Sequence, residues 1–111
     1  MARNEETYVV EACLTWLDVH RFVHCRTQSA AVQTAWGSYL KTGTPGWPDI
    51  TVFWNGTGIG VEVKTNRKGS KQSPAQIEME KRIEEAGCTY VVVRSVDELK
   101  DFFEINGWKP R

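Results

Sequence analysis

A short stretch in the middle of the chain constrains the fold more than any other part of the sequence. Two segments rich in β-branched and aromatic residues, Ile50–Trp54 and Ile59–Thr65, flank the turn residues Asn55-Gly56-Thr57-Gly58. Asn and Gly tolerate the positive φ angles that tight hairpin turns require. The stretch therefore predicts two antiparallel strands joined by a hairpin turn.

The alternation of apolar residues limits how these strands pair, because neighbouring side chains on a strand point to opposite faces. One face of the hairpin is apolar throughout only if each even-numbered residue of one strand pairs with an odd-numbered residue of the other. Val52 opposite Val61 is one such register, and a tighter turn at Asn55-Gly56 gives another. In both, the opposite face carries Asp49, Thr51, Phe53, Gly60, Glu62 and Lys64.

Three ionisable side chains converge on that opposite face in either register. Asp49 lies across from Lys64 and diagonal to Glu62 in the first register, and directly across from Glu62 in the tighter one. Such Cβ atoms are about 5 to 7 Å apart, so the two carboxylates can hold one cation such as Mg²⁺ between them. Gly60 on the same face leaves room for a backbone or a substrate to approach closely.

This arrangement suits the hydrolysis of a phosphodiester bond. A bound Mg²⁺ ion lowers the pKa of a water ligand and neutralises charge that develops on the phosphate. The Lys64 ammonium can orient that water or stabilise the charged transition state. Asp49 and Glu62 are thus predicted metal ligands, and Lys64 is a predicted catalytic residue.

The charged residues also point to nucleic acid, although the net charge of the chain is +0. Zero net charge argues against coating of nucleic acid by bulk electrostatics. The basic residues Lys64, Arg67, Lys68 and Lys71, however, fall in one stretch that contains no acid. This stretch predicts a loop that contacts DNA beside the second hairpin strand, and a solvated loop is the alternative.

Helical and strand-like patterns alternate along the rest of the chain. Ser73-Pro74-Ala75-Gln76 forms a capping box with proline at the first helical position. In chain order we expect a helix at Glu5–Val19, a strand near Phe22–Thr27, a partly irregular connection at Ser29–Trp47, the hairpin, a helix from Ser73 to about Ala86, a buried strand at Thr89–Arg94, and a helix from Ser95 to near Phe103. This order predicts an α/β fold with a mixed β-sheet covered by helices, and 111 residues fit a single domain.

The motifs resemble those of a known family. Pro48-Asp49, Glu62-Val63-Lys64 and the segment Ser73 to Gln76 resemble the signature of PD-(D/E)xK nucleases, and the VRR-NUC group is the closest variant. The resemblance implies a restriction-endonuclease-like core, dependence on Mg²⁺ or Mn²⁺, and action on DNA, often branched. For stand-alone members it also implies a homodimer. The family usually has a small residue or threonine before Pro-Asp, where this chain has Trp47, which bears on how the loop meets DNA.

The resemblance also assigns residues outside the hairpin. It places the family's acid on the first helix at Glu6, with Glu11 as the weaker candidate, and its glutamine at Gln76. It places the family's basic residue on the early strand at Arg26, and the backbone carbonyl of Val63 becomes a further metal ligand. Plainer interpretations stay open. Gln76 caps its helix in any case, Glu6 suits a first helical turn, and Arg26 suits a strand end.

Other features bear on location and on competing sites. The N-terminus does not resemble a signal peptide, no stretch is long enough to span a membrane, and three unpaired cysteines suit a cytoplasmic protein. No nucleotide cofactor is implied. We discount a zinc site at His20 and His24 because no third ligand lies near them in the sequence. Aromatic residues between Trp36 and Trp47 either stack on unpaired bases or pack in the core or against another subunit.

The hairpin pattern predicts a metal-dependent nuclease, and the family resemblance implies a DNA endonuclease that is selective for branched DNA such as Holliday junctions and acts as a homodimer. Asp49, Glu62, Lys64 and Gln76 are the predicted catalytic residues, and Arg26, Arg67, Lys68 and Lys71 are the predicted DNA contacts. A non-catalytic module that binds nucleic acid on the same fold is the alternative, and a protein-interaction domain is a further one.

Overall fold

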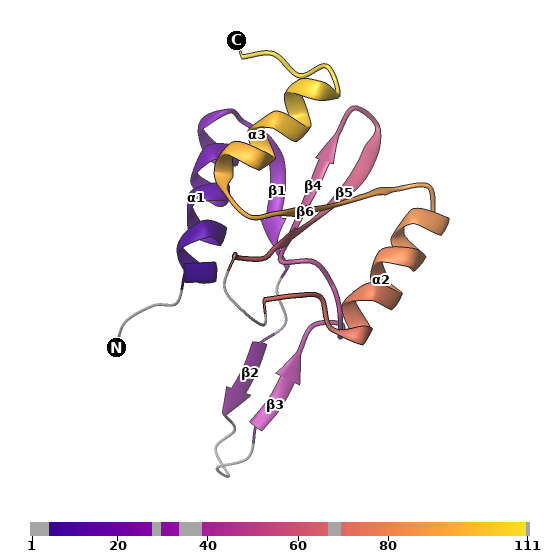
Figure 1. The fold of residues 1–111 in the computed structure, drawn as a ribbon. Helices are drawn as coiled ribbons and strands as arrows, with labels where there is room; N and C mark the ends of the chain where they lie inside the picture. The colour runs from indigo at the N-terminus through magenta and orange to yellow at the C-terminus, as the bar shows by residue number, and fades with distance from the viewer. Residues whose placement is uncertain (1–4, 28–29, 34–38, 67–69, 111) are drawn as a thin grey trace.

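A mixed four-stranded sheet forms the centre of the computed structural model, which describes residues 5–27, 30–33, 39–66 and 70–110. The strand order is β1-β4-β5-β6. The pairs β1–β4 and β4–β5 are antiparallel, and β5–β6 is parallel. The strands are β1 (Val23–Arg26), β4 (Ile50–Trp54), β5 (Thr57–Val63) and β6 (Thr89–Val93). The predicted α/β fold with a mixed sheet and a central hairpin is therefore confirmed (Figure 1).

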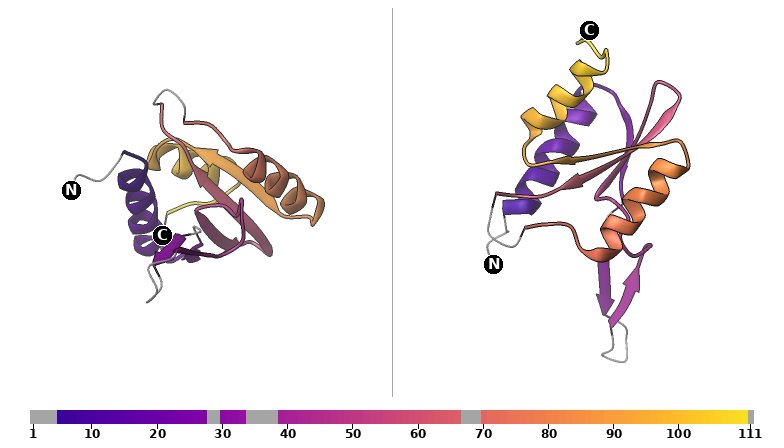
Figure 2. Two further views of the ribbon diagram at one scale, coloured as in Figure 1. Left: turned by 90° about the horizontal axis from the view of Figure 1, so that it is seen from below. Right: turned by 45° about the vertical axis from the view of Figure 1, so that its right-hand side comes forward.

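Helices cover both faces of this sheet. α1 (Glu5–Val19) and α3 (Val96–Ile105) lie together on one face, and α2 (Pro74–Glu85) lies on the other, as Figures 1 and 2 show. The main hydrophobic core fills the space between these two helices, α1 and α3, and the sheet face that they cover. Fully buried side chains in it include Val10, Leu17, Ile50, Val61 and Phe103. None of the described helices is long and apolar enough to cross a membrane.

The hairpin uses the tighter of the two registers. Ile50 pairs with Val61 and Trp54 with Thr57, so the turn consists of Asn55 and Gly56 with φ angles of 53° and 79°. Thr57 and Gly58 belong to β5, which therefore starts two residues before the predicted Ile59. Continuing this register by one position places Asp49 opposite Glu62.

The helix boundaries agree closely with the patterns in the sequence. α1 spans the predicted range, and α2 begins at Pro74 with both hydrogen bonds of the capping box around Ser73. Gly87 follows α2 with a φ of 86°, as expected for a helix stop. α3 continues two residues beyond the predicted end at Phe103.

The connection between β1 and β4, expected to be partly irregular, contains a second sheet. β2 (Ala30–Gln33) and β3 (Tyr39–Thr42) pair antiparallel, and among the described residues they pair with no other strand. Figures 1 and 2 show this β-arm extending away from the four-stranded sheet. Short alanine-containing runs carry little strand signal, because alanine is depleted in strands and gives no alternation of apolar and polar residues.

Candidate active site

Three carboxylates from separate parts of the chain meet at one end of the sheet. Glu6 comes from the first turn of α1, Asp49 directly precedes β4, and Glu62 belongs to β5. One oxygen of each lies within 4.8 Å of the other two. Asp49 is 4% exposed, Glu62 is 0% exposed and Glu6 is half-buried. The structure thus brings Glu6 to the predicted pair, and Glu11 is not part of this carboxylate cluster.

Two backbone amides, one in β5 and one directly after β1, hold Asp49 in place. The Val63 amide donates a 2.8 Å hydrogen bond to Asp49 Oδ2, and the Thr27 amide donates one of 2.8 Å to the Asp49 carbonyl. The preceding Pro48 is buried against Gly60, where an added Cβ would lie 2.6 Å from Pro48 Cγ. The space at Gly60 is therefore taken by the proline ring that positions Asp49, and not by substrate.

Glu62 has one oxygen held by the protein and one without a hydrogen-bond donor. Gln76 Nε2 donates a 2.9 Å hydrogen bond to Glu62 Oε1, and Lys64 Nζ lies 3.7 Å from the same oxygen. Glu62 Oε2 is buried and has no hydrogen-bond partner among the described residues. Its neighbour is the Asp49 carboxylate, which offers only acceptors when ionised. A proton or a cation is needed between the two groups.

The electrostatics of the cluster reflect this crowding of acids. Burial raises the pKa of Glu62 to about 9, with a further upward effect of Asp49 and Glu6 and a downward effect of Lys64. Burial, followed by the charge of Asp49, also raises the pKa of Glu6. The site therefore favours either a shared proton or an added positive charge.

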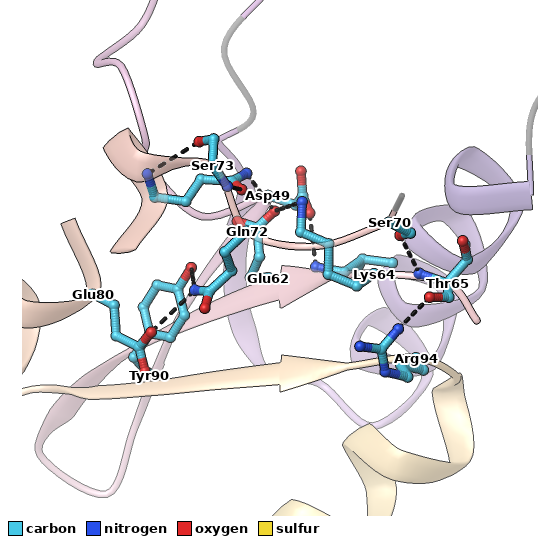
Figure 3. Close-up of polar contacts among 12 residues, drawn as sticks. Asp49, Glu62, Lys64, Thr65, Ser70, Gln72, Ser73, Glu80, Tyr90 and Arg94 are labelled. Atoms are coloured by element: carbon cyan, nitrogen blue, oxygen red, sulfur yellow. Dashed lines mark hydrogen bonds and ion pairs between the residues drawn. The ribbon is translucent and has the colours of Figure 1, made fainter. Parts of the chain in front are cut away.

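Lys64 lies directly after β5, and its ammonium group points into the site. The Lys64 amide donates a 2.9 Å hydrogen bond to the Val93 carbonyl, which extends the parallel ladder by one position. The residue is only 8% exposed. Figure 3 shows Lys64, Glu62 and Asp49 side by side, with Gln72 and Ser73 above the strand. The three residues predicted from the hairpin pattern therefore share one buried location.

Gln76 performs its structural role and contacts the site at the same time. Its Oε1 accepts a 2.8 Å hydrogen bond from the Ser73 amide, and its own amide donates one of 3.2 Å to Ser73 Oγ. Its Nε2 reaches Glu62. The two interpretations of Gln76 that the sequence left open are therefore compatible.

The predicted DNA contacts are placed only in part. Arg26 at the end of β1 and Lys71 before α2 are both exposed. Arg67 and Lys68 lie outside the described residues. One hydrogen bond joins the two ends of the loop that carries these basic residues: the Thr65 amide donates to Ser70 Oγ at 2.8 Å. The Thr65 carbonyl in turn accepts a hydrogen bond from Arg94 Nη1.

Trp47 and the two histidines, which the sequence offered as possible base-stacking or zinc-binding residues, have contacts within the protein. Trp47 Nε1 donates a 2.9 Å hydrogen bond to Thr51 Oγ1, so this indole is held on the sheet. Trp36 lies outside the described residues. His24 Nε2 lies 3.2 Å from Asp18 Oδ1, and the His20 ring packs on Trp16. Neither histidine belongs to the metal-ligating group found among the described residues.

A polar network that no pattern in the sequence predicts braces the segment before α2. Gln72 Nε2 donates hydrogen bonds of 3.0 Å to Glu80 Oε1 and 3.2 Å to the Tyr90 hydroxyl, as drawn in Figure 3. Burial raises the pKa of Tyr90, so the hydroxyl stays protonated. The signal for these residues is weak, because they come from three separate segments and belong to no spaced motif.

Comparison with known proteins supports the fold. No family model matches the chain, and no curated protein matches it. A solved structure described as a VRR_NUC domain superposes with a TM-score of 0.64 and 21% sequence identity, covering 92% of this chain and 97% of that one. The chain therefore has the fold of a VRR_NUC domain, and the resemblance stated from the motifs is confirmed at the level of the fold.

Proposed function

We propose that this chain forms a single nuclease domain over residues 1–111 and acts as a metal-dependent DNA endonuclease that hydrolyses phosphodiester bonds. The observation that carries the proposal is the convergence of Glu6, Asp49 and Glu62 beside Lys64 in a buried site. The likeness in fold to a VRR_NUC domain supports it.

The donor set suits a hard divalent cation. Every member of the cluster offers carboxylate oxygen, which Mg²⁺ and Mn²⁺ prefer. The buried Glu62 Oε2 lacks a hydrogen-bond donor among the described residues, as expected for an atom that completes its coordination with a cation. When bound, such an ion supplies charge neutralisation and a water of lowered pKa. Glu6, Asp49 and Glu62 would hold it, and the Val63 carbonyl remains a predicted further ligand.

The protein holds these ligands in fixed orientations before any ion binds. The Val63 amide anchors Asp49 Oδ2, and the Gln76 side chain anchors Glu62 Oε1. Each of these two carboxylates thus has one oxygen engaged by the protein. Such anchoring lowers the cost of reorganising ligands around a cation.

Lys64 and Gln76 supply the remaining polar groups. The Lys64 ammonium, 3.7 Å from Glu62 Oε1, can stabilise negative charge on a phosphoryl oxygen or orient an attacking water. The Gln76 amide has two N–H donors, of which Glu62 uses one. The second can donate to a water or to the phosphate.

We also propose which residues contact DNA, and that the protein acts on branched DNA as a homodimer. Arg26 and Lys71 are exposed cations suited to phosphate contact, and Arg67 and Lys68 stay predicted contacts of the same kind.

One carboxylate cluster cuts one strand at a time, so symmetric resolution of a four-way junction needs a second copy. We therefore propose a two-fold homodimer acting on branched DNA, as the family resemblance implies. The β-arm is an element that a second copy can pair with, because an isolated two-stranded sheet is only marginally stable.

Cleavage of labelled linear, flapped, forked and four-way-junction DNA tests this proposal. The wild type should cut in Mg²⁺ and Mn²⁺, should stop on addition of EDTA, and should prefer branched substrates. Asp49→Asn and Lys64→Met each remove one charge from the site at nearly constant side-chain volume. Both variants should be inactive. Glu104→Gln, at an exposed position of α3, is the matched control and should remain active. Binding without cleavage by the folded wild type in either metal would instead favour the non-catalytic binding module.

A further inference from the structure

A second candidate site lies at the opposite end of the sheet from the carboxylate cluster. An open pocket of about 760 Å³ is formed by the end of α1, the start of β1, the β4–β5 turn and the segment after α3. All of these parts lie in the upper half of Figure 1. Trp54 lines the pocket and Asp49 precedes the same strand, so the two sites are about 17 Å apart at about 3.4 Å per residue.

The pocket lining is positively charged. It contains Arg21 and Lys109 together with His20, and it contains no aspartate or glutamate. Neither Arg21 nor Lys109 forms an ion pair within the described part of the chain. Asp18, on the last turn of α1, instead contacts His24 at 3.2 Å. The pocket therefore favours an anionic ligand.

Aromatic rings form another part of the lining. Phe53 is 62% exposed, and Trp54 and Trp108 are half-buried. Flat apolar faces next to cations suit a nucleotide, because its base can stack on a ring and its phosphate can pair with a basic side chain.

The backbone of Arg21 gives an independent indication that its side chain has a role. The Phe22 amide bonds to the Leu17 carbonyl at 2.9 Å and the Arg21 amide to the Asp18 carbonyl at 3.1 Å, so α1 ends in a Schellman motif. Arg21 takes the left-handed position of this motif, with a φ of 59°, where glycine is favoured. The positive charge near a helix C-terminus offsets only part of that strain. An arginine at this position is explained if its guanidinium binds a ligand.

We propose that this pocket binds one unpaired nucleotide of a DNA strand, with the phosphate at Arg21 and Lys109 and the base against the indole rings of Trp54 and Trp108. The choice of DNA rests on the proposed function. The binding itself requires neither a metal ion nor cleavage, so the two proposals fail separately.

Titration of the ¹⁵N-labelled protein in EDTA tests the pocket directly. The probes are thymidine 5′-monophosphate and a short oligothymidylate, with thymidine and inorganic phosphate as controls. The indole N–H signals of Trp54 and Trp108 should shift on addition of either probe, and that of Trp47, held by Thr51, should not shift on addition of the mononucleotide.

Two substitutions separate binding from folding. Arg21→Gly should weaken binding about tenfold while the melting temperature is retained, because glycine suits the backbone at this position. Lys109→Ala should weaken binding similarly, and Lys100→Ala, at an exposed position of α3, should not.

The proposal is overturned if the two indole signals do not shift, if Arg21→Gly and Lys109→Ala both bind as tightly as the wild type, or if inorganic phosphate alone binds as tightly as the nucleotide. Intact binding in a protein that cuts no DNA would support the pocket and contradict only the proposed nuclease function.

Discussion

Gln76 Nε2 donates a 2.9 Å hydrogen bond to Glu62 Oε1 while Gln76 Oε1 accepts one of 2.8 Å from the Ser73 amide. The capping box therefore fixes which end of the amide faces the carboxylate cluster. Helix α2 and the candidate metal centre are linked through this single side chain.

Gln76→Glu should separate the two roles of the residue. Glutamate also completes a capping box, so the helix and the melting temperature should be retained. The donor to Glu62 is lost and a fourth carboxylate enters the cluster, so the cleavage rate should fall about 10- to 100-fold. Single-turnover kinetics and a melting curve measure the two effects. Glu78→Gln, exposed on the same helix, is the control. Full activity of Gln76→Glu would show that its contact with Glu62 is irrelevant to catalysis.

The metal-free protein should lose stability as the pH rises. Burial, with Asp49 next, raises the pKa of Glu62 from 4.5 to about 9 in the folded chain. Above pH 4.5 the unfolded chain releases this proton while the folded chain keeps it, so folding becomes progressively less favourable up to about pH 9. Melting temperatures in EDTA should fall between these limits by more than about 4 °C. Glu62→Gln should flatten the profile, and a melting temperature that rises with pH would contradict the assignment.

Metal binding should release a proton. A cation at Glu62 Oε2 replaces the proton that burial retains there, so Mg²⁺ affinity should increase with pH up to about 9. Calorimetric titrations in two buffers of different ionisation enthalpy count the protons released. Asp49→Asn should abolish both binding and release. Binding with no proton release at pH 7 would indicate that Glu62 is not a ligand.

Gly60→Ala should disturb the site through Pro48. The added Cβ would lie 2.6 Å from Pro48 Cγ, so the ring and the following Asp49 must shift. We expect a loss of about 1 to 3 kcal/mol in the free energy of unfolding, together with reduced cleavage. Gly58→Ala on the same strand is the matched control, because its Cβ would meet only Cys88 Sγ at 3.5 Å and Phe53 Cε1 at 3.8 Å. Equal effects of the two substitutions would contradict this account of Gly60.

Local patterns were sufficient to predict the hairpin and the residues it brings together. Alternation along β4 and β5 fixes their faces, so Asp49, Glu62 and Lys64 had to lie on one side whichever turn was used. The turn itself was left open between two registers, because Asn55-Gly56 and the longer loop satisfy the same alternation. In the structure Thr57 pairs with Trp54 and Gly58 with Phe53, which selects the two-residue turn at Asn55-Gly56.

Contacts between distant segments were beyond the reach of those patterns. Glu6 reaches the cluster because α1 packs on β5, and only the family resemblance pointed to it. The Arg94 contact with Thr65 and the network around Gln72 depend on tertiary packing, which no spacing in the sequence encodes. The β-arm was missed because main-chain pairing, and not a side-chain pattern, defines it.

The most direct test of the metal centre is an anomalous difference map from crystals of the protein soaked in Mn²⁺. A metal centre at Glu6, Asp49 and Glu62 predicts one or two peaks within about 2.3 Å of their carboxylate oxygens, lost in crystals of Asp49→Asn. Well-ordered crystals with Mn²⁺ bound elsewhere, or with the Glu62 and Asp49 carboxylates still in contact and no ion between them, would contradict it.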